Sequence, residues 1–171
     1  MSRPPVDSLV TDTGPLISLE RLDGGYEFMR QMYRRIWAPP AVLREIALGQ
    51  SATPQIYLEQ YAITDFVYEQ APLTLPHNIS WQSDLHPGEL EAIALAQELD
   101  LPLLIEEAAG RKAAQELHIP FSGIAGQILK AARLSILTRQ QGYRMLEQLL
   151  HNGRIGRALF NLLVESLAAE G

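Results

Sequence analysis

The sequence predicts an α/β fold in which a parallel sheet is flanked by helices in three layers, with a helical extension at the C-terminus. Two observations lead to this prediction. Short apolar runs that suit buried strands alternate along the chain with segments of helical periodicity, which is typical of a parallel sheet with crossover helices. Acidic residues also follow the predicted strands, at the edge where open α/β sheets bind ligands.

The composition limits the possible classes of protein. A chain of 171 residues, 47% of them hydrophobic, is long enough for one domain with a sizeable core. The absence of cysteine excludes disulfides and thiolate zinc sites. The net charge of −6 argues against a broad basic surface for nucleic acid. No apolar run approaches the ~20 residues that span a bilayer, and no signal-peptide segment opens the chain. We therefore expect a cytoplasmic protein that makes no membrane contact.

The first half of the chain predicts strand–helix units. A strand at Leu9–Val10 precedes Asp12, and Pro15 suits the first turn of the next helix. That helix is short because Asp23-Gly24-Gly25 is a stop signal. The elements expected after it are a helix over 26–36 with Ile36 facing inward, a strand over 36–38, a helix over 41–49, a short helix over 54–61 and an edge strand over 63–70.

The second half centres on residues 85–111, which read as helix, turn, buried strand and helix. The first helix has one apolar arc with Glu89 in its middle, whereas Glu91 and Glu98 fall on the polar side. The strand, LPLLI, ends at Glu106–Glu107. The residues of the apolar arc are Ala92, Ile93, Leu95, Ala96 and Leu99.

After this stretch we expect a helix, a short strand at 119–123 and a helix that reaches residue 137. Two more helices with apolar faces follow from Thr138 and break near Asn152-Gly153. We therefore divide the chain into a domain over 1–137 and C-terminal helices over 138–171, packed on that domain or on a partner.

Right-handed crossovers bring the carboxyl end of every strand, and the start of each following helix, to one edge of the sheet. Asp12 and Glu106–Glu107 end strands there, and Glu45 and Glu89 lie in early turns of helices that begin there. Close carboxylates repel unless they are protonated or bridged by a cation. Oxygen ligands without Cys or His favour Mg²⁺ or Mn²⁺, which can activate a water for attack on a phosphodiester.

Ordinary structural roles also explain each of these residues. Asp12 or Thr13 would cap a helix, Glu89 would interact with a helix dipole, and Glu45 and the Glu pair would be solvated. His77 and His86 have no metal-ligand spacing and are interpreted as ordinary polar residues.

The ordered segments DTGPLI, PPAVLREI, HPGELEAIALA, LLIEEAAGRKAA and IPFSGIAGQILKA resemble the PIN domain over roughly residues 9–137. They are most similar to a bacterial and archaeal PIN-like group of unknown function. The resemblance implies a parallel sheet with an acidic metal pocket and ribonuclease activity. It also implies RNA as substrate. Many PIN domains are toxins of type II toxin–antitoxin pairs, so an antitoxin protein and a second copy of the chain are expected partners.

Residue by residue, the resemblance makes Asp12, Glu45 and Glu89 metal-binding carboxylates with catalytic roles. The fourth carboxylate falls on Glu106 or Glu107, and the choice stays open because the family more often has Asp where this chain has Glu106. Substrate contacts are expected from three further residues, Thr13, Arg111 and Ser122. Arg111 matches the Arg of the family's Gly-Arg pair.

Other functions remain as alternatives. A catalytically weak PIN-like module that binds RNA or a protein partner is favoured by the Glu106 departure and the acidic composition. A haloacid-dehalogenase-type phosphatase would need a second Asp at position 14, which is Gly14, and a receiver domain would need a lone Asp at the end of a middle strand. The nuclease is therefore the leading hypothesis.

Overall fold

The computed structural model describes residues 6–76 and 84–169, so His77 lies outside the described residues. Within these ranges the strands form one parallel sheet in the order β3-β2-β1-β4-β5. The central strand β1 pairs through Val10 with Trp37 on one side and with Leu103 on the other. The strands are β1 (Ser8–Thr11), β2 (Arg35–Ala38), β3 (Val67–Glu69), β4 (Leu103–Leu104) and β5 (Phe121–Ser122).

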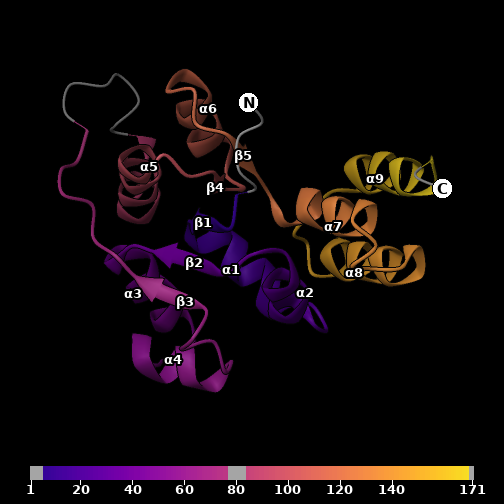
Figure 1. Ribbon diagram of the computed structural model, residues 1–171, viewed down its shortest axis with the longest axis horizontal. Helices are drawn as coiled ribbons and strands as arrows, with labels where there is room; N and C mark the ends of the chain where they lie inside the picture. Colours follow the sequence, from indigo (N-terminus) through magenta and orange to yellow (C-terminus); the bar gives the residue numbers. More distant parts are fainter. Residues whose placement is uncertain (1–5, 77–83, 170–171) are drawn as a thin grey trace.

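Helices cover both faces of the sheet, as Figure 1 shows: α5 and α6 lie on one side, and α1, α2 and α7 on the other. The predicted three-layer α/β fold is confirmed, and the C-terminal helices α8 and α9 stack on α7. The helices are α1 (Thr13–Glu20), α2 (Gly25–Met32), α3 (Pro40–Gly49), α4 (Pro54–Gln60), α5 (Pro87–Leu99), α6 (Ala108–Glu116), α7 (Ile124–Arg133), α8 (Arg139–His151) and α9 (Arg157–Ala169).

The strand order places a topological switch point between β1 and β4. From β1 the chain moves outward to β2 and β3, and it then returns to β4 and continues to β5 on the other side. A crevice opens at such a point, at the carboxyl ends of the two strands, and ligands of open α/β sheets bind there. Asp12 directly follows β1, and Glu106 and Glu107 follow β4 after Ile105. The acidic residues therefore stand at the switch point.

The core explains why the strands at the switch point carry apolar runs. Every residue of β1 is buried, and Leu103, Leu104 and Ile105 have no exposed surface. Burying one such side chain stabilises the fold by roughly 1.5–3 kcal/mol. The same core continues into the C-terminal helices through Leu146, Leu149, Phe160 and Leu167. Among the described residues, no helix is long and apolar enough to cross a membrane.

The helix expected over 26–36 is shorter, because α2 ends at Met32 and Tyr33 is already extended. Ile36 lies in β2 and is fully buried, in agreement with the strand expected over 36–38. Two expectations about individual residues were wrong. Leu99 is 39% exposed, since α5 ends there before a left-handed residue. Glu91 is half-buried, because its carboxylate accepts a hydrogen bond of 3.0 Å from the Ala41 N–H in the first turn of α3.

Candidate active site

Asp12, Glu45, Glu89 and Glu107 line one pocket of about 510 Å³, which we call the acidic pocket. Asp12 and Glu107 follow β1 and β4, and Glu45 and Glu89 project from α3 and α5. The structure thus brings together carboxylates that are far apart in the sequence, where the strand–helix pattern predicts them to meet. The other lining residues are Thr13, Gly14, Ile17, His86 and Arg154.

Asp12 is a buried carboxyl group of the acidic pocket. It is only 3% exposed, and its Oδ1 atom has no hydrogen-bond partner among the described residues. Burial raises the pKa of Asp12 to about 7, the Thr13 backbone partly opposes the shift, and the charges of Glu89, Glu45 and Glu107 raise it further. A buried carboxylate with these neighbours is costly to ionise unless a cation joins it.

Glu89 is the second buried carboxylate with an unpartnered oxygen. Its Oε2 accepts a hydrogen bond of 2.9 Å from the His86 N–H, whereas Oε1 has no partner in the described part of the chain. Helix α6 approaches this oxygen closely at Gly110, where a Cβ would lie 3.1 Å from Oε1 and would overlap the Ile105 side chain. Glycine in the Gly-Arg pair therefore allows α6 to pack against Glu89.

Glu45, in contrast, has its oxygens engaged by the protein. Oε2 accepts a hydrogen bond of 2.7 Å from the Thr13 hydroxyl, and Oε1 accepts one of 3.0 Å from the Gly88 N–H. A Cβ at Gly88 would lie 2.7 Å from Oε2, so a larger residue there would displace the Glu45 carboxylate from this position. Glu45 thus connects the start of α1 to the start of α5 at the wall of the pocket. The Thr13 hydroxyl contacts the pocket carboxylates through its hydrogen bond to Glu45.

The structure separates the two consecutive glutamates. Glu107 is exposed at the rim of the acidic pocket. Glu106 turns away from that pocket: the Ser18 hydroxyl lies 2.7 and 2.9 Å from its two oxygens, and Arg154 Nη2 lies 3.8 Å from Oε2. Glu107 therefore lines the acidic pocket with the other carboxylates and Glu106 does not, while the role of either one as fourth carboxylate stays a prediction.

The pKa of Glu106 reflects a different environment from that of Asp12. Burial raises the pKa of Glu106, whereas the Ser18 hydroxyl and the positive charges of Arg154 and Arg111 lower it. The net direction is upward, so burial outweighs its partners. Glu106 is nevertheless a paired group, because a hydroxyl and a guanidinium face its carboxylate.

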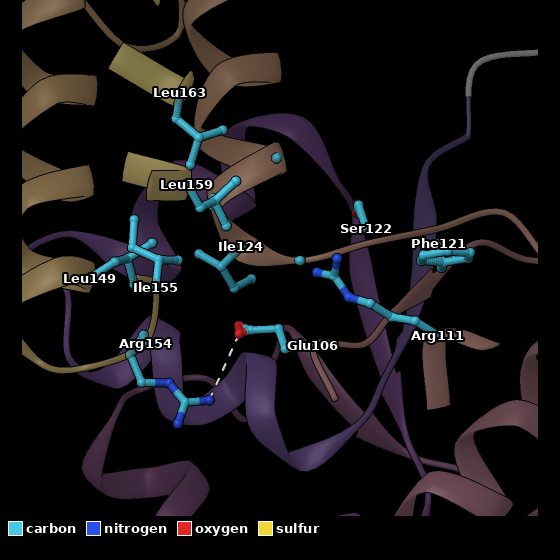
Figure 2. A pocket seen from close by; sticks show the side chains of 13 residues that line it. Glu106, Arg111, Phe121, Ser122, Ile124, Leu149, Arg154, Ile155, Leu159 and Leu163 are labelled. Carbon is cyan, nitrogen blue, oxygen red and sulfur yellow. Dashed lines mark ion pairs between the residues drawn. The ribbon is translucent and has the colours of Figure 1, made fainter. Parts of the chain in front are cut away.

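Arg111 and Ser122 line a neighbouring pocket of about 360 Å³, together with Glu106 (Figure 2). Neither residue lines the acidic pocket, because β5 lies beyond β4 and its end opens beside α7, and their substrate contacts stay a prediction. Thr13 is the one predicted substrate-contact residue in the acidic pocket.

Sequence reasoning missed Arg154, which lines both pockets from the connection between α8 and α9. Its Nε donates to the Ser18 hydroxyl at 2.9 Å and its Nη2 donates to the Gly14 carbonyl at 3.0 Å. No local pattern marks Arg154. Ser18 did carry a signal, because it lies on the core-facing side of α1 beside Leu19, and a buried hydroxyl needs a partner. His86, expected to be an ordinary polar residue, lines the acidic pocket.

The oxygens of the acidic pocket that lack protein partners decide whether it suits a divalent cation. Within residues 6–76 and 84–169, no group of three or more His, Asp or Glu side chains is arranged so that it could hold a metal ion. Two buried carboxylate oxygens, Asp12 Oδ1 and Glu89 Oε1, nevertheless lack partners. Mg²⁺ is commonly held by one or two carboxylates and keeps several waters. The donor set at Asp12 and Glu89 therefore fits a hard divalent cation.

Comparisons with known proteins identify the family of this chain. No curated protein matches. A solved PilT N-terminus domain protein from the hyperthermophilic archaeon Sulfolobus solfataricus is 18% identical, with a TM-score of 0.49, over 68% of this chain and 87% of that chain. A family model described as "DUF3368: PIN domain" matches residues 8–168. Because this match spans nearly the whole chain, the protein belongs to the PIN domain family, whose members are generally nucleases.

Proposed function

We propose that this protein is an Mg²⁺- or Mn²⁺-dependent endoribonuclease that hydrolyses RNA phosphodiester bonds in the acidic pocket. The observation that carries the proposal is the pair of buried, unpartnered oxygens of Asp12 and Glu89 at the switch point of the sheet. Membership of a family of nucleases supports the reaction class.

Each residue of the pocket has a distinct role in this proposal. Asp12 and Glu89 would hold the cation, which when bound supplies a positive charge for the phosphate and lowers the pKa of a water. Glu107, exposed at the rim, accepts the proton of the water that attacks phosphorus as the bond to the leaving oxygen breaks. Glu45, fixed by Thr13 and Gly88, keeps α1 and α5 in register around the pocket.

The test uses single-stranded and structured RNA, incubated with the parent protein in Mn²⁺ and in chelator. We expect cleavage that requires the metal and that falls by more than about a hundredfold in Asp12→Asn, because one of the two free carboxylate ligands becomes an amide. Asp12→Asn purified in the same way is also the control for contaminating ribonuclease. Equal cleavage by parent and variant would contradict the proposal.

A toxin role is the finer part of the proposal, and it rests on the family alone. An antitoxin protein would then bind the chain, and a second copy of the chain is a further expected partner. Expression of the parent in a bacterial host should slow growth, whereas expression of Asp12→Asn to the same level should not. Equal growth of the two cultures would remove the toxin role and leave the nuclease proposal intact.

A weak-activity binding module is the second candidate. It is favoured because both oxygens of Glu45 are used inside the protein and because the described residues contain no ready set of three metal ligands. This candidate predicts RNA or partner binding without cleavage, unchanged in Asp12→Asn. Metal-dependent cleavage would exclude it.

A further inference from the structure

The neighbouring pocket of about 360 Å³, which we call the lateral pocket, has two walls of different chemistry (Figure 2). Its size is within the range of about 300–1,000 Å³ that is usual for small-molecule sites. One wall carries Glu106, Arg111 and Ser122, and the opposite wall is apolar. A site of this kind suits a ligand with a flat apolar face and a polar edge.

The polar wall presents free donors beside an acceptor. Arg111 Nε donates to the Ile105 carbonyl at 3.2 Å, while its Nη groups donate no hydrogen bond within the described part of the chain. The guanidinium lies 6.0 Å from the centroid of the Phe121 ring, and a Cβ at Gly123 would come within 2.8 Å of Nη2. Arg111 is therefore held in place with its outer donors available. Glu106 lies on the same wall, with a carboxylate that already accepts from the Ser18 hydroxyl and retains further acceptor capacity.

The apolar wall comes mainly from the C-terminal helices. Ile124 begins α7, Leu149 belongs to α8, and Ile155 and Leu159 belong to the α8–α9 connection and α9. Leu159 is 44% exposed, so a ligand in the lateral pocket would cover an apolar side chain that the protein itself leaves open. Flat bases of single-stranded RNA pack on such apolar and guanidinium surfaces.

The two pockets are adjacent. Arg154 lines both of them, and the consecutive residues Glu106 and Glu107 face one each. Gly14, which lines the acidic pocket, lies at the boundary: a Cβ there would be 3.5 Å from Arg154 Nη2 and 3.8 Å from Glu106 Cβ. An RNA strand bound at the acidic pocket would therefore pass beside the lateral pocket, across the shared Arg154.

We propose that the lateral pocket binds the nucleobase next to the cleaved phosphodiester, with its edge toward Arg111 and Glu106 and its face against the Ile155–Leu159 wall. The place of this base in a cleaved strand rests on the proposed nuclease function. A phosphate alone fits less well for two reasons. The carboxylate of Glu106 offsets part of the positive charge of Arg111, and the apolar wall provides no hydrogen-bond donor for an anion. Donors and an acceptor on one wall distinguish bases by their edges.

The test is calorimetric binding to the full chain, with the four ribonucleoside 5′-monophosphates, ribose 5-phosphate and inorganic phosphate as probes. We expect at least one nucleotide to bind about tenfold or more tightly than ribose 5-phosphate, because only the nucleotide carries a base. Leu159→Asn, similar in size but polar, should remove that difference. Leu162→Asn, on the same helix and 62% exposed outside the pocket lining, should retain it.

Two results would overturn the lateral-pocket proposal. In the first, ribose 5-phosphate or inorganic phosphate binds the parent as tightly as every nucleotide. In the second, Leu159→Asn and Leu162→Asn bind nucleotides equally well. Its failure is distinguishable from that of the nuclease proposal, because binding needs no cleavage. RNA cleavage with no base selectivity at the lateral pocket would sink the base site alone, whereas base-selective binding without metal-dependent cleavage would sink the nuclease alone.

Discussion

Asp12 and Glu106 are two carboxyl groups at the ends of adjacent strands, and burial raises the pKa of both. The charged groups that surround these two carboxyl groups differ in sign. Around Asp12 the other charges are carboxylates, which raise its pKa further, whereas Ser18, Arg154 and Arg111 lower the pKa of Glu106. The fold therefore places cationic side chains beside Glu106 and only further carboxylates beside Asp12.

A similar difference separates the two consecutive glutamates, Glu106 and Glu107, by their contacts. Glu106 joins α1 to the α8–α9 connection through Ser18 and Arg154. Glu107 makes no such bond in the described structure and remains exposed at the acidic pocket. The first residue of the pair is bonded to other elements of the protein, and the second is exposed at the pocket rim.

The largest expected effect comes from replacing each glutamate of this pair by glutamine in turn. Glu107→Gln should lower RNA cleavage by about a hundredfold, because it removes a candidate proton acceptor, and should change stability little because the residue is exposed. Glu106→Gln keeps the size of the side chain and an acceptor for Ser18, so cleavage should fall by less than about tenfold. Steady-state kinetics on one RNA compares the two. If cleavage falls more in Glu106→Gln than in Glu107→Gln, the catalytic carboxylate is Glu106 and the role proposed for Glu107 is wrong.

The pH dependence of stability tests the uncompensated charge of Asp12. Its pKa is 3.8 in the unfolded chain and about 7 when folded, so the folded state binds more protons between these values. The free energy of unfolding of the metal-free protein should therefore fall as the pH rises from about 4 to about 7. The contribution of this group is at most about 4 kcal/mol.

Asp12→Asn supplies the control for this titration. Urea denaturation across the pH range should show a smaller decline for the variant, which should be the more stable protein at pH 7 without metal. Mn²⁺ should raise the melting temperature of the parent more than that of the variant, because a ligand of the folded state stabilises it. Parallel pH profiles for the two proteins would refute a raised pKa at Asp12.

The compensated charge of Glu106 is tested by Arg154→Met. The substitution leaves Glu106 without its ion pair and the Gly14 carbonyl without a donor, and should cost about 1–3 kcal/mol of unfolding free energy. Arg154 is 24% exposed in its side chain, which limits the loss. In a double-mutant cycle, adding Glu106→Gln to Arg154→Met should cost less than it costs alone. Additive losses would mean that Glu106 and Arg154 do not interact.

The sequence predicted the acidic pocket far better than the lateral pocket, and the reason is physical. Asp12 and Glu89 stand in a strand–helix pattern that fixes their places at the sheet edge. Arg154 arrives through packing of α8 and α9 on α7, which no local pattern encodes. Glu107 lines the acidic pocket and Glu106 does not, because Glu106 contacts Ser18 and Arg154, which are remote in sequence. Sequence spacing does not predict such contacts.

The smallest effect concerns the close approach of α6 to Glu89. Gly110→Ala would gain up to about 1 kcal/mol of helix propensity, but its Cβ would overlap the Ile105 side chain and lie 3.1 Å from Glu89 Oε1. Overpacking at a buried site typically costs about 1–3 kcal/mol, so the net change should be a loss of up to about 2 kcal/mol. Gly126→Ala in α7 is the matched control, since its Cβ would lie 3.7 Å from Ser122 Cβ in ordinary contact, and it should be neutral or stabilising. Chemical denaturation measures both variants. If Gly110→Ala were as stable as Gly126→Ala, α6 would have room to move, and the tight packing that holds Glu89 beside Asp12 would not be needed to keep the acidic pocket in place.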